Sequence, residues 1–197
     1  MKLGHVVKRA GMLVVAVALV GACKKGPTEP EGEVPTLPPT DPATVLFMDD
    51  FDSENGGRGV YNWTQFQNWN VLEGCVDLHG NGFDDVQPGR GLYVDLDGTC
   101  GKAGTMETKA DFALGPGEYV LEFWLSGNQR RGNRDSVDVS LGTLYQERIV
   151  LGRSDPFALF TRNVTVPQAT NARLRFKHYE GDHFGILLDL VRLRRAE

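Results

Sequence analysis

An acidic residue, Asp189, lies inside one of the most apolar stretches of this 197-residue chain. The stretch reads GDHFGILLDLVRL over residues 181–193, with leucine, isoleucine and valine on both sides of the carboxylate. A buried carboxylate without a partner is costly, so Asp189 needs hydrogen-bond donors, a cation or a metal ion close by. Its surroundings therefore point to a site or to a tightly held loop.

Catalytic motifs are scarce. Outside the N-terminal segment the histidines are His79, His178 and His183, and none lies in a nucleophile-elbow or zinc-protease motif. Acidic residues are numerous, so a glycosidase pair of carboxylates is not excluded by their count, but no particular pair is indicated. We therefore predict that the protein is not an enzyme.

The segment YVLEFWL, residues 119–125, offers an aromatic ring for ligand binding. Strict alternation places Trp124 and Glu122 on the face opposite the apolar side chains of the same segment. An exposed tryptophan beside polar groups suits stacking on a sugar ring. The alternative is that Trp124 packs under a loop.

The loop that follows, GNQRRGNRD, is the most basic part of an otherwise acidic region. The guanidinium groups of Arg130 and Arg131 suit the carboxylates or sulfates of acidic glycans. A solvated hairpin tip is the alternative interpretation. We predict that Trp124, Glu122, Arg130 and Arg131 contribute to a ligand site.

Residues 1–22 have the pattern of an export signal. Lys2, Lys8 and Arg9 precede a short apolar run, and small residues lead to Cys23. Val20-Gly21-Ala22-Cys23 resembles the bacterial lipobox, so we predict that Cys23 becomes lipidated and holds the protein to a membrane. An ordinary signal peptide or an uncleaved anchor is the alternative. Lys24, which follows the cysteine, favours the outer membrane or cell surface.

Residues 23–44 are rich in proline, threonine and glutamate and nearly free of apolar side chains. Such a segment cannot bury enough surface to fold, and we expect a disordered tether. In an extended polyproline conformation, at ~3.1 Å per residue, it would reach up to roughly 60 Å.

Residues 45–197 are long enough for a single domain with a substantial core. Loss of residues 1–22, which contain three basic and no acidic residues, would change the formal net charge from −5 to −8. So acidic a protein is a poor nucleic-acid binder. In an oxidising compartment Cys75 and Cys100 are expected to form a disulfide, the alternative being two free thiols.

From residue 45 onward the hydrophobic pattern has a period of two. Apolar and polar residues alternate in YVLEFWL, DSVDVSLG and ARLRFKHYE, and short segments rich in glycine, proline, asparagine and aspartate separate such runs. This pattern predicts an all-β fold, an antiparallel two-sheet jelly-roll sandwich.

Several segments together resemble a known family. These are DDFDSENGG, NWNVLEGCVDLHGNGF, PGRGLYVDLDG, FALGPGEYVLEFWLSGNQR and GDHFGILLDLVRL. They are similar to exported bacterial proteins with a galactose-binding-like β-sandwich, many of which are sorted to the surface by exosortase-type signals. The resemblance implies a fold and an exported location, and an activity only weakly, because the same sandwich serves as carbohydrate-binding module, adhesion domain and enzyme accessory domain.

The resemblance also implies a structural calcium ion, shared between the first and last strands. Here Asp189 would face the acidic residues Asp49, Asp50 and Asp52, with Asp52 the best match and Asp50 beside it. Calcium takes about six to eight oxygen ligands, which carboxylates and backbone carbonyls can supply. The alternative is that Asp189 accepts hydrogen bonds from loop amides while the N-terminal aspartates are solvated.

We therefore expect a lipid-anchored surface protein whose sandwich is a non-catalytic carbohydrate-binding or surface-interaction module. One alternative is a structural or adhesion protein of the cell envelope with a protein partner and no saccharide ligand. A glycan-active enzyme is a third.

Overall fold

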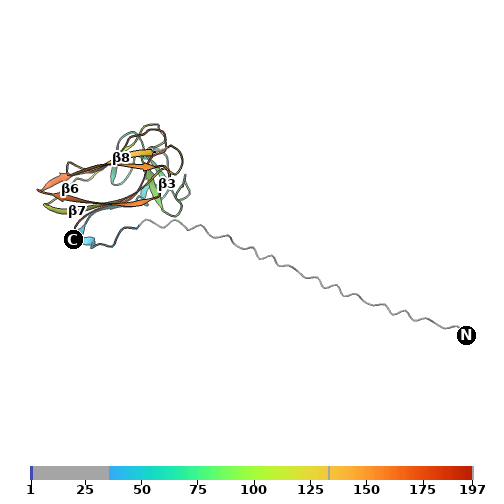
Figure 1. Cartoon of the computed structure of the whole chain (residues 1–197), viewed down its shortest axis with the longest axis horizontal. Helices are drawn as coiled ribbons and strands as arrows, with labels where there is room; N and C mark the ends of the chain where they lie inside the picture. Colours follow the sequence, from blue (N-terminus) through green and yellow to red (C-terminus); the bar gives the residue numbers. More distant parts are fainter. Residues whose placement is uncertain (2–35, 133, 197) are drawn as a thin grey trace.

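The computed structural model describes Met1 and residues 36–132 and 134–196. The predicted signal peptide beyond Met1, Cys23 and residues 24–35 of the predicted tether lie outside the described residues. The described chain forms an antiparallel β-sandwich, as the alternating pattern predicted (Figure 1). No helix in the described residues is long and apolar enough to cross a membrane.

One layer is a six-stranded sheet in the order β10-β7-β13-β4-β3, with β1 paired to β13 beyond the end of β4. Its strands are β1 (Val45–Asp49), β3 (Asp77–Gly80), β4 (Leu92–Asp95), β7 (Gly117–Ser126), β10 (Ala158–Val166) and β13 (Leu187–Arg195).

The other layer is a five-stranded sheet in the order β2-β5-β12-β8-β9. Its strands are β2 (Trp69–Glu73), β5 (Thr105–Thr108), β8 (Arg134–Leu141), β9 (Tyr145–Gly152) and β12 (Leu174–His178). A small third sheet pairs β6 (Phe112–Leu114) with β11 (Thr170–Ala172). In Figure 1, β7 and β8 mark the two stacked layers.

The core lies between the layers and is rich in aromatic rings. Trp69, Phe123 and Phe176 are fully buried there. The indole Nε1 of Trp69 donates a 2.9 Å hydrogen bond to Asp49 Oδ2, which satisfies its polar atom inside the core. Trp69 is therefore a core residue.

A disulfide joins Cys75 and Cys100, 25 residues apart, as predicted. It ties the turn after β2 to the turn after β4. Those two turns lie together because the backbone N–H of Gly98 also donates to the carbonyl of Cys75, at 2.9 Å.

A β-bulge interrupts β13 between Asp189 and Arg192, where the pairing with β7 changes register. Leu190 at this point has a positive φ of 40°, which is rare for a leucine. Leu188 points into the core before the bulge and Val191 after it. The extra residue places the side chains of Asp189, Leu190 and Arg192 on the outer face of the sheet.

Residues 36–44, which the sequence assigns to the tether, lie against the outer face of the six-stranded sheet. They include a short 3₁₀ helix, η1 (Pro42–Thr44), that leads into β1; a second, η2 (Glu54–Gly56), follows β1. The Arg192 side chain donates a 2.9 Å hydrogen bond to the carbonyl of Pro38. We call residues 36–42 the strap. The strap thus covers part of the sheet surface and accepts a hydrogen bond from a buried guanidinium.

Candidate functional site

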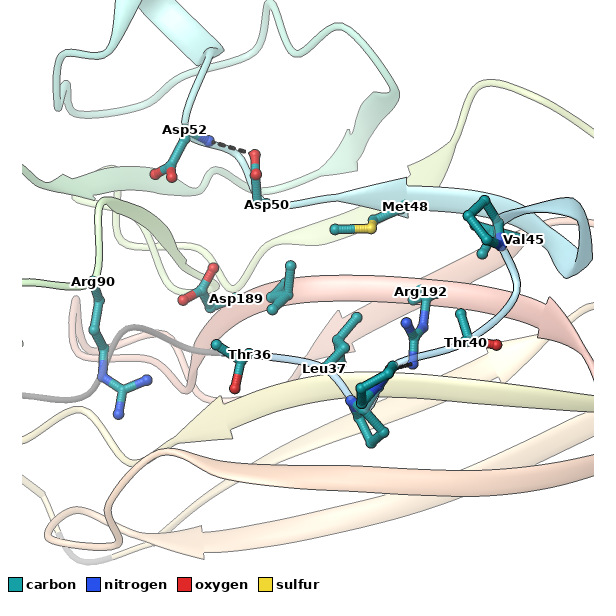
Figure 2. A pocket seen from close by; sticks show the side chains of 14 residues that line it. Thr36, Leu37, Thr40, Val45, Met48, Asp50, Asp52, Arg90, Asp189 and Arg192 are labelled. Atoms are coloured by element: carbon teal, nitrogen blue, oxygen red, sulfur yellow. Dashed lines mark hydrogen bonds between the residues drawn. The ribbon is translucent and has the colours of Figure 1, made fainter.

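A cavity of about 710 Å³ lies on the outer face of the six-stranded sheet, between the strap, β1 and β13 (Figure 2). The strap and β1 contribute mainly apolar groups. The charged side chains of the lining are those of Asp50, Asp52, Asp189, Arg90 and Arg192, and the strap adds the hydroxyl groups of Thr36 and Thr40. The volume is in the range of small-molecule sites, and one apolar wall opposite a few polar groups is typical of them.

Asp189 forms the buried floor of this cavity. The residue is 1% exposed, and its Oδ2 has no hydrogen-bond partner within the described part of the chain. Burial raises the pKa of Asp189 to about 8, and the nearby negative charge of Asp52 adds to the rise, while the Leu190 N–H and the Arg90 charge oppose it. Asp189 is therefore a carboxyl group that favours a bound proton or another positive charge.

Asp50 and Asp52 line the same cavity, so the structure brings together three of the four carboxylates named from the sequence. Asp52 Oδ1 accepts a 2.7 Å hydrogen bond from the Leu92 N–H, and Asp50 Oδ1 accepts one of 3.1 Å from the Asp52 N–H. Burial raises the pKa of Asp52 as well. Asp49, the other acidic residue of this run, lies in the core, where its Oδ2 accepts a hydrogen bond from Trp69.

The three aspartates suit a calcium ion by their chemistry. Their donor set is all oxygen, and Asp189 Oδ2 is buried with no hydrogen-bond partner among the residues that the structure describes. They are not drawn into a tight cluster, however. Among the described residues, the one acidic or histidine group whose three ligand atoms lie within 4.8 Å of one another is Asp135, His178 and Glu180.

That second group is already satisfied by hydrogen bonds. His178 Nδ1 lies 2.9 Å from the Glu180 carbonyl, and His178 Nε2 accepts from the Ile186 N–H at 3.3 Å. The Glu180 carboxylate accepts from the Ser136 N–H at 2.8 Å, and Asp135 Oδ2 accepts from Asn128 at 2.9 Å. We interpret the group as a structural network that fixes a loop, with His178 buried.

Trp124 lies beside the cavity but is covered. It pairs with Asp189 across β7 and β13, and its ring is half-buried with Nε1 lacking a hydrogen-bond partner among the described residues. The Arg90 guanidinium stacks 5.6 Å from its ring centroid and 4.5 Å from that of Phe157. Packing under a loop, the alternative to an exposed tryptophan, is what the structure has. Arg90 both lines the cavity and covers Trp124.

Glu122 does not offer a free carboxylate to a ligand. It is 1% exposed and forms ion pairs with Arg192 at 2.7 Å and with Arg194 at 3.4 Å. The bulge in β13 causes this difference from the predicted ligand role, because it turns both arginines toward the face that Glu122 occupies. Glu122 instead holds Arg192, which in turn binds the strap.

Arg130 and Arg131 lie away from the cavity, so the structure does not join them with Trp124. Arg130 contacts Asp84 Oδ2 at 3.1 Å and His79 Nδ1 at 3.2 Å. The Arg131 guanidinium carbon lies 5.3 Å from the Phe184 ring centroid. Arg130 thus fastens the β3–β4 loop to the β7–β8 loop, and Arg131 is exposed at the hairpin.

Exposed aromatic rings occur elsewhere than predicted. Tyr179 is 43% exposed on the outer face of the five-stranded sheet. Its hydroxyl donates to Asp138 Oδ2 at 2.7 Å, and the Arg148 guanidinium carbon lies 4.1 Å from its ring centroid. The alternation of ARLRFKHYE could have identified it, because Tyr179 follows the inward-facing His178. Its ring face is partly occupied by Arg148, so we rank the cavity first.

No protein-family model matches this sequence, and no curated protein matches it at a significant level. Solved structures with a similar arrangement include the CBM22-1–GH10 modules of Clostridium thermocellum endo-1,4-β-D-xylanase 10B complexed with xylohexaose. That likeness has 15% identity and a TM-score of 0.46, and covers 78% of this chain and 29% of that one. This chain thus corresponds to less than a third of the xylanase.

Two further structures are similar over most of their length. The K1 cleaved adhesin domain of Lys-gingipain from Porphyromonas gingivalis has 16% identity and a TM-score of 0.49, with 77% of this chain and 98% of that chain covered. The C-terminal CBM6 of the laminarinase LamC from Zobellia galactanivorans has 13% identity and a TM-score of 0.39, with 70% and 100% covered. All three TM-scores lie below 0.5, so the likeness does not identify a ligand for this chain.

Proposed function

We propose that the domain is a non-catalytic saccharide-binding module and that the saccharide binds in the cavity beside Asp189. The observation that supports this most directly is the pairing of a buried, unpartnered carboxyl oxygen with an apolar wall across a cavity of about 710 Å³. A sugar ring has a hydroxyl edge and an apolar C–H face. It therefore matches a cavity with polar and apolar sides.

The cavity residues divide the task of binding in this proposal. Asp189 and Asp50 accept hydrogen bonds from neighbouring hydroxyls, and Arg90 donates to ring or hydroxyl oxygens. Leu37 and Met48 contact the C–H face from the strap and from β1. Three carboxylates in one cavity also disfavour acidic sugars, so neutral saccharides are the expected class.

Calorimetric titration with the neutral oligosaccharides that bind on a glycan array tests this function. Titrations are made at pH 9, above the pKa of about 8 of Asp189, where its carboxyl group is ionised. Asp189→Asn keeps the size of the side chain but removes this charge, and it is expected to weaken binding about tenfold or more, the effect of losing one charged hydrogen bond. The control is Tyr179→Ala on the opposite sheet, which should leave affinity unchanged. Loss of binding in the control, with Asp189→Asn unaffected, would move the site to the other face.

The non-catalytic part of the proposal is checked with the same oligosaccharides. Prolonged incubation followed by chromatography should return them uncleaved. New reducing ends that disappear in Asp189→Asn would instead indicate that this carboxyl group acts as an acid or base.

We also propose a structural calcium ion held by Asp189, Asp52 and Asp50 at the floor of the cavity. Support comes from the all-oxygen donor set and from the orphaned Asp189 Oδ2. Calcium, but not magnesium, should raise the thermal unfolding midpoint of the wild type at pH 8. Asp189→Asn should abolish the rise, and Asp111→Asn, at an exposed ion pair with Arg173, should retain it.

The setting of this module is proposed to be the bacterial cell surface. Lipidation of Cys23 would hold the protein to the membrane, and residues 24–35 would connect the lipid to the strap. The support is the sequence pattern of residues 1–35.

A further inference from the structure

The strap forms nearly half of the cavity wall. Six of the fourteen lining residues belong to it, and they come from a continuous piece of chain immediately before β1. In Figure 2 the strap passes in front of β13, with Thr36 and Leu37 close to Asp189 and Thr40 beyond Arg192. Without the strap, the cavity would be an open sheet face.

The strap is attached to the sheet by limited contact. Its residues are exposed or half-buried, and none is fully buried. The hydrogen bond from Arg192 to the carbonyl of Pro38, 2.9 Å long, joins its centre to β13. Segments that bury little apolar surface open at much lower free energy than the core does. The strap can therefore leave the sheet without unfolding the sandwich.

The attachment point itself is rigid. Arg192 is 5% exposed, and Glu122 holds its guanidinium by an ion pair of 2.7 Å on the neighbouring strand. This geometry presents an N–H group to the Pro38 carbonyl whether or not the strap is present. The sheet thus contains a preformed receptor for one carbonyl of the strap.

The strap's composition lowers the cost of docking. Pro38, Pro39 and Pro42 each have a fixed φ and no N–H group that needs a partner. At its C-terminal end, Asp41 Oδ1 accepts a 2.9 Å hydrogen bond from the Ala43 N–H, which fixes the turn of η1 into β1. A stiff segment with a fixed turn at one end moves as a unit about that turn.

We propose that the strap is a hinged cover of the cavity, latched by Arg192, and that strap docking and ligand binding favour each other. The ligand part of this inference rests on the proposed saccharide site, whereas the docking part does not. Coupling is reciprocal: a ligand that contacts the docked strap stabilises docking, and a docked strap raises ligand affinity by the same factor. The affinity of the site would then depend on the chain segment that precedes the domain.

Hydrogen exchange of the strap peptide, resolved to the amides of Leu37, Thr40 and Asp41 and measured on the full protein, tests the docking. Pro38→Gly combined with Pro39→Gly raises the entropy of the undocked strap without removing a side chain of the sheet. Exchange of this peptide should become about 4- to 30-fold faster. Pro167→Gly, the same change at an exposed turn after β10, is the matched control and should leave the strap unchanged. Strap exchange at the rate of an unstructured peptide in the wild type overturns the proposal.

The coupling is tested with two probes added separately, xylohexaose and calcium chloride, by calorimetry and by exchange. Calcium, whose proposed ligands lie outside the strap, should leave strap exchange unchanged. Xylohexaose, if it binds the wild type, should slow strap exchange. Its Kd in the double variant should rise at least as much as the inverse of the docked fraction that exchange reports, because Pro38 and Pro39 also line the cavity. Equal affinity in wild type and double variant overturns the coupling. A wild type that binds neither probe, while its strap stays protected, overturns the proposed site and its coupling but leaves the docked cover in place.

Discussion

The carboxyl group of Asp189 shows how one residue can connect a site to the stability of the fold. Its burial disfavours the charged form, and its pKa of about 8 lies well above that of an aspartate in the unfolded chain. Because Asp189 binds a proton more tightly in the folded protein than in the unfolded chain, the free energy of unfolding depends on pH. This gives a prediction whose sign is fixed.

In calcium-free buffer, the stabilising effect of the raised Asp189 pKa is fully present below the unfolded pKa of about 4 and is lost as pH rises through 8. Between pH 5 and pH 8 the loss is on the order of 4 kcal/mol. The Asp189→Asn variant should not lose this stability, because its side chain does not titrate. Urea unfolding at several pH values should therefore show a wild type that weakens toward pH 8 relative to the variant. Parallel pH profiles for the two proteins would contradict the burial of this group. Asp52 also has a raised pKa and is present in both proteins; because its charge interacts with Asp189, the difference between the profiles contains Asp189 together with this interaction.

We predict that Glu122 contributes to the free energy of unfolding. Glu122→Ala leaves the buried guanidinium of Arg192 without its carboxylate, which should lower the free energy of unfolding by about 3–5 kcal/mol. Glu118→Ala, at an exposed glutamate of the same strand that accepts from Thr165, should cost less than about 1 kcal/mol. Chemical denaturation of both variants measures the difference. Similar costs for the two would mean that the ion pair is not buried in solution.

At the scale of elements, alternation predicted the strands whose two faces differ clearly. β7, β8 and β12 each present their apolar residues to the core, as the sequence indicates. Alternation does not predict which side chains of β13 face the core, because this strand is apolar on both sides of a bulge that changes the alternation. The position of a bulge depends on pairing with β7, and single-strand periodicity does not contain that information.

The strap was missed for a different reason. Its proline-rich composition is typical of disorder, and the local sequence gives no sign of the buried Arg192 that binds it. A tertiary contact between residues 154 positions apart decides its conformation.

The disulfide is an element-scale prediction that can be measured directly. Cys75→Ser combined with Cys100→Ser opens a loop of 25 residues in the unfolded chain and should lower the free energy of unfolding by about 3.5 kcal/mol. Urea unfolding of the oxidised wild type and the double variant gives this value. A variant as stable as the wild type would show that the bond contributes little. The reduced wild type should behave like the variant.

Across the whole molecule, the residues predicted to bind calcium lie together in the structure, whereas the residues predicted to bind a saccharide lie apart. Asp50, Asp52 and Asp189 line one cavity because the first and last strands pair, which a sandwich of this kind makes predictable. Trp124 and Arg130 are close in sequence. Trp124 lies in β7, however, whereas Arg130 lies in the loop after it, and the two side chains do not share a site. Loop geometry carried Arg130 toward Asp84.

The proposed anchoring is tested by fractionation. Cys23→Ser removes the only thiol that could accept lipid under the lipobox interpretation, so the protein should move from the detergent-soluble membrane fraction to the aqueous fraction. Metabolic labelling with a fatty acid should be lost in the same variant. A wild type found entirely in the aqueous fraction would contradict the lipid anchor while leaving the cavity unaffected.

Nuclear magnetic resonance mapping of the protein tests whether the cavity on the six-stranded sheet binds a saccharide. During titration with an oligosaccharide that binds on the array, we predict that the largest shifts fall on the amides of Asp189 and Leu190, the Nε–H of Arg90 and the indole N–H of Trp124. Shifts centred on Tyr179 and Asp138 of the opposite sheet, or no shifts at all, would rule out saccharide binding in this cavity.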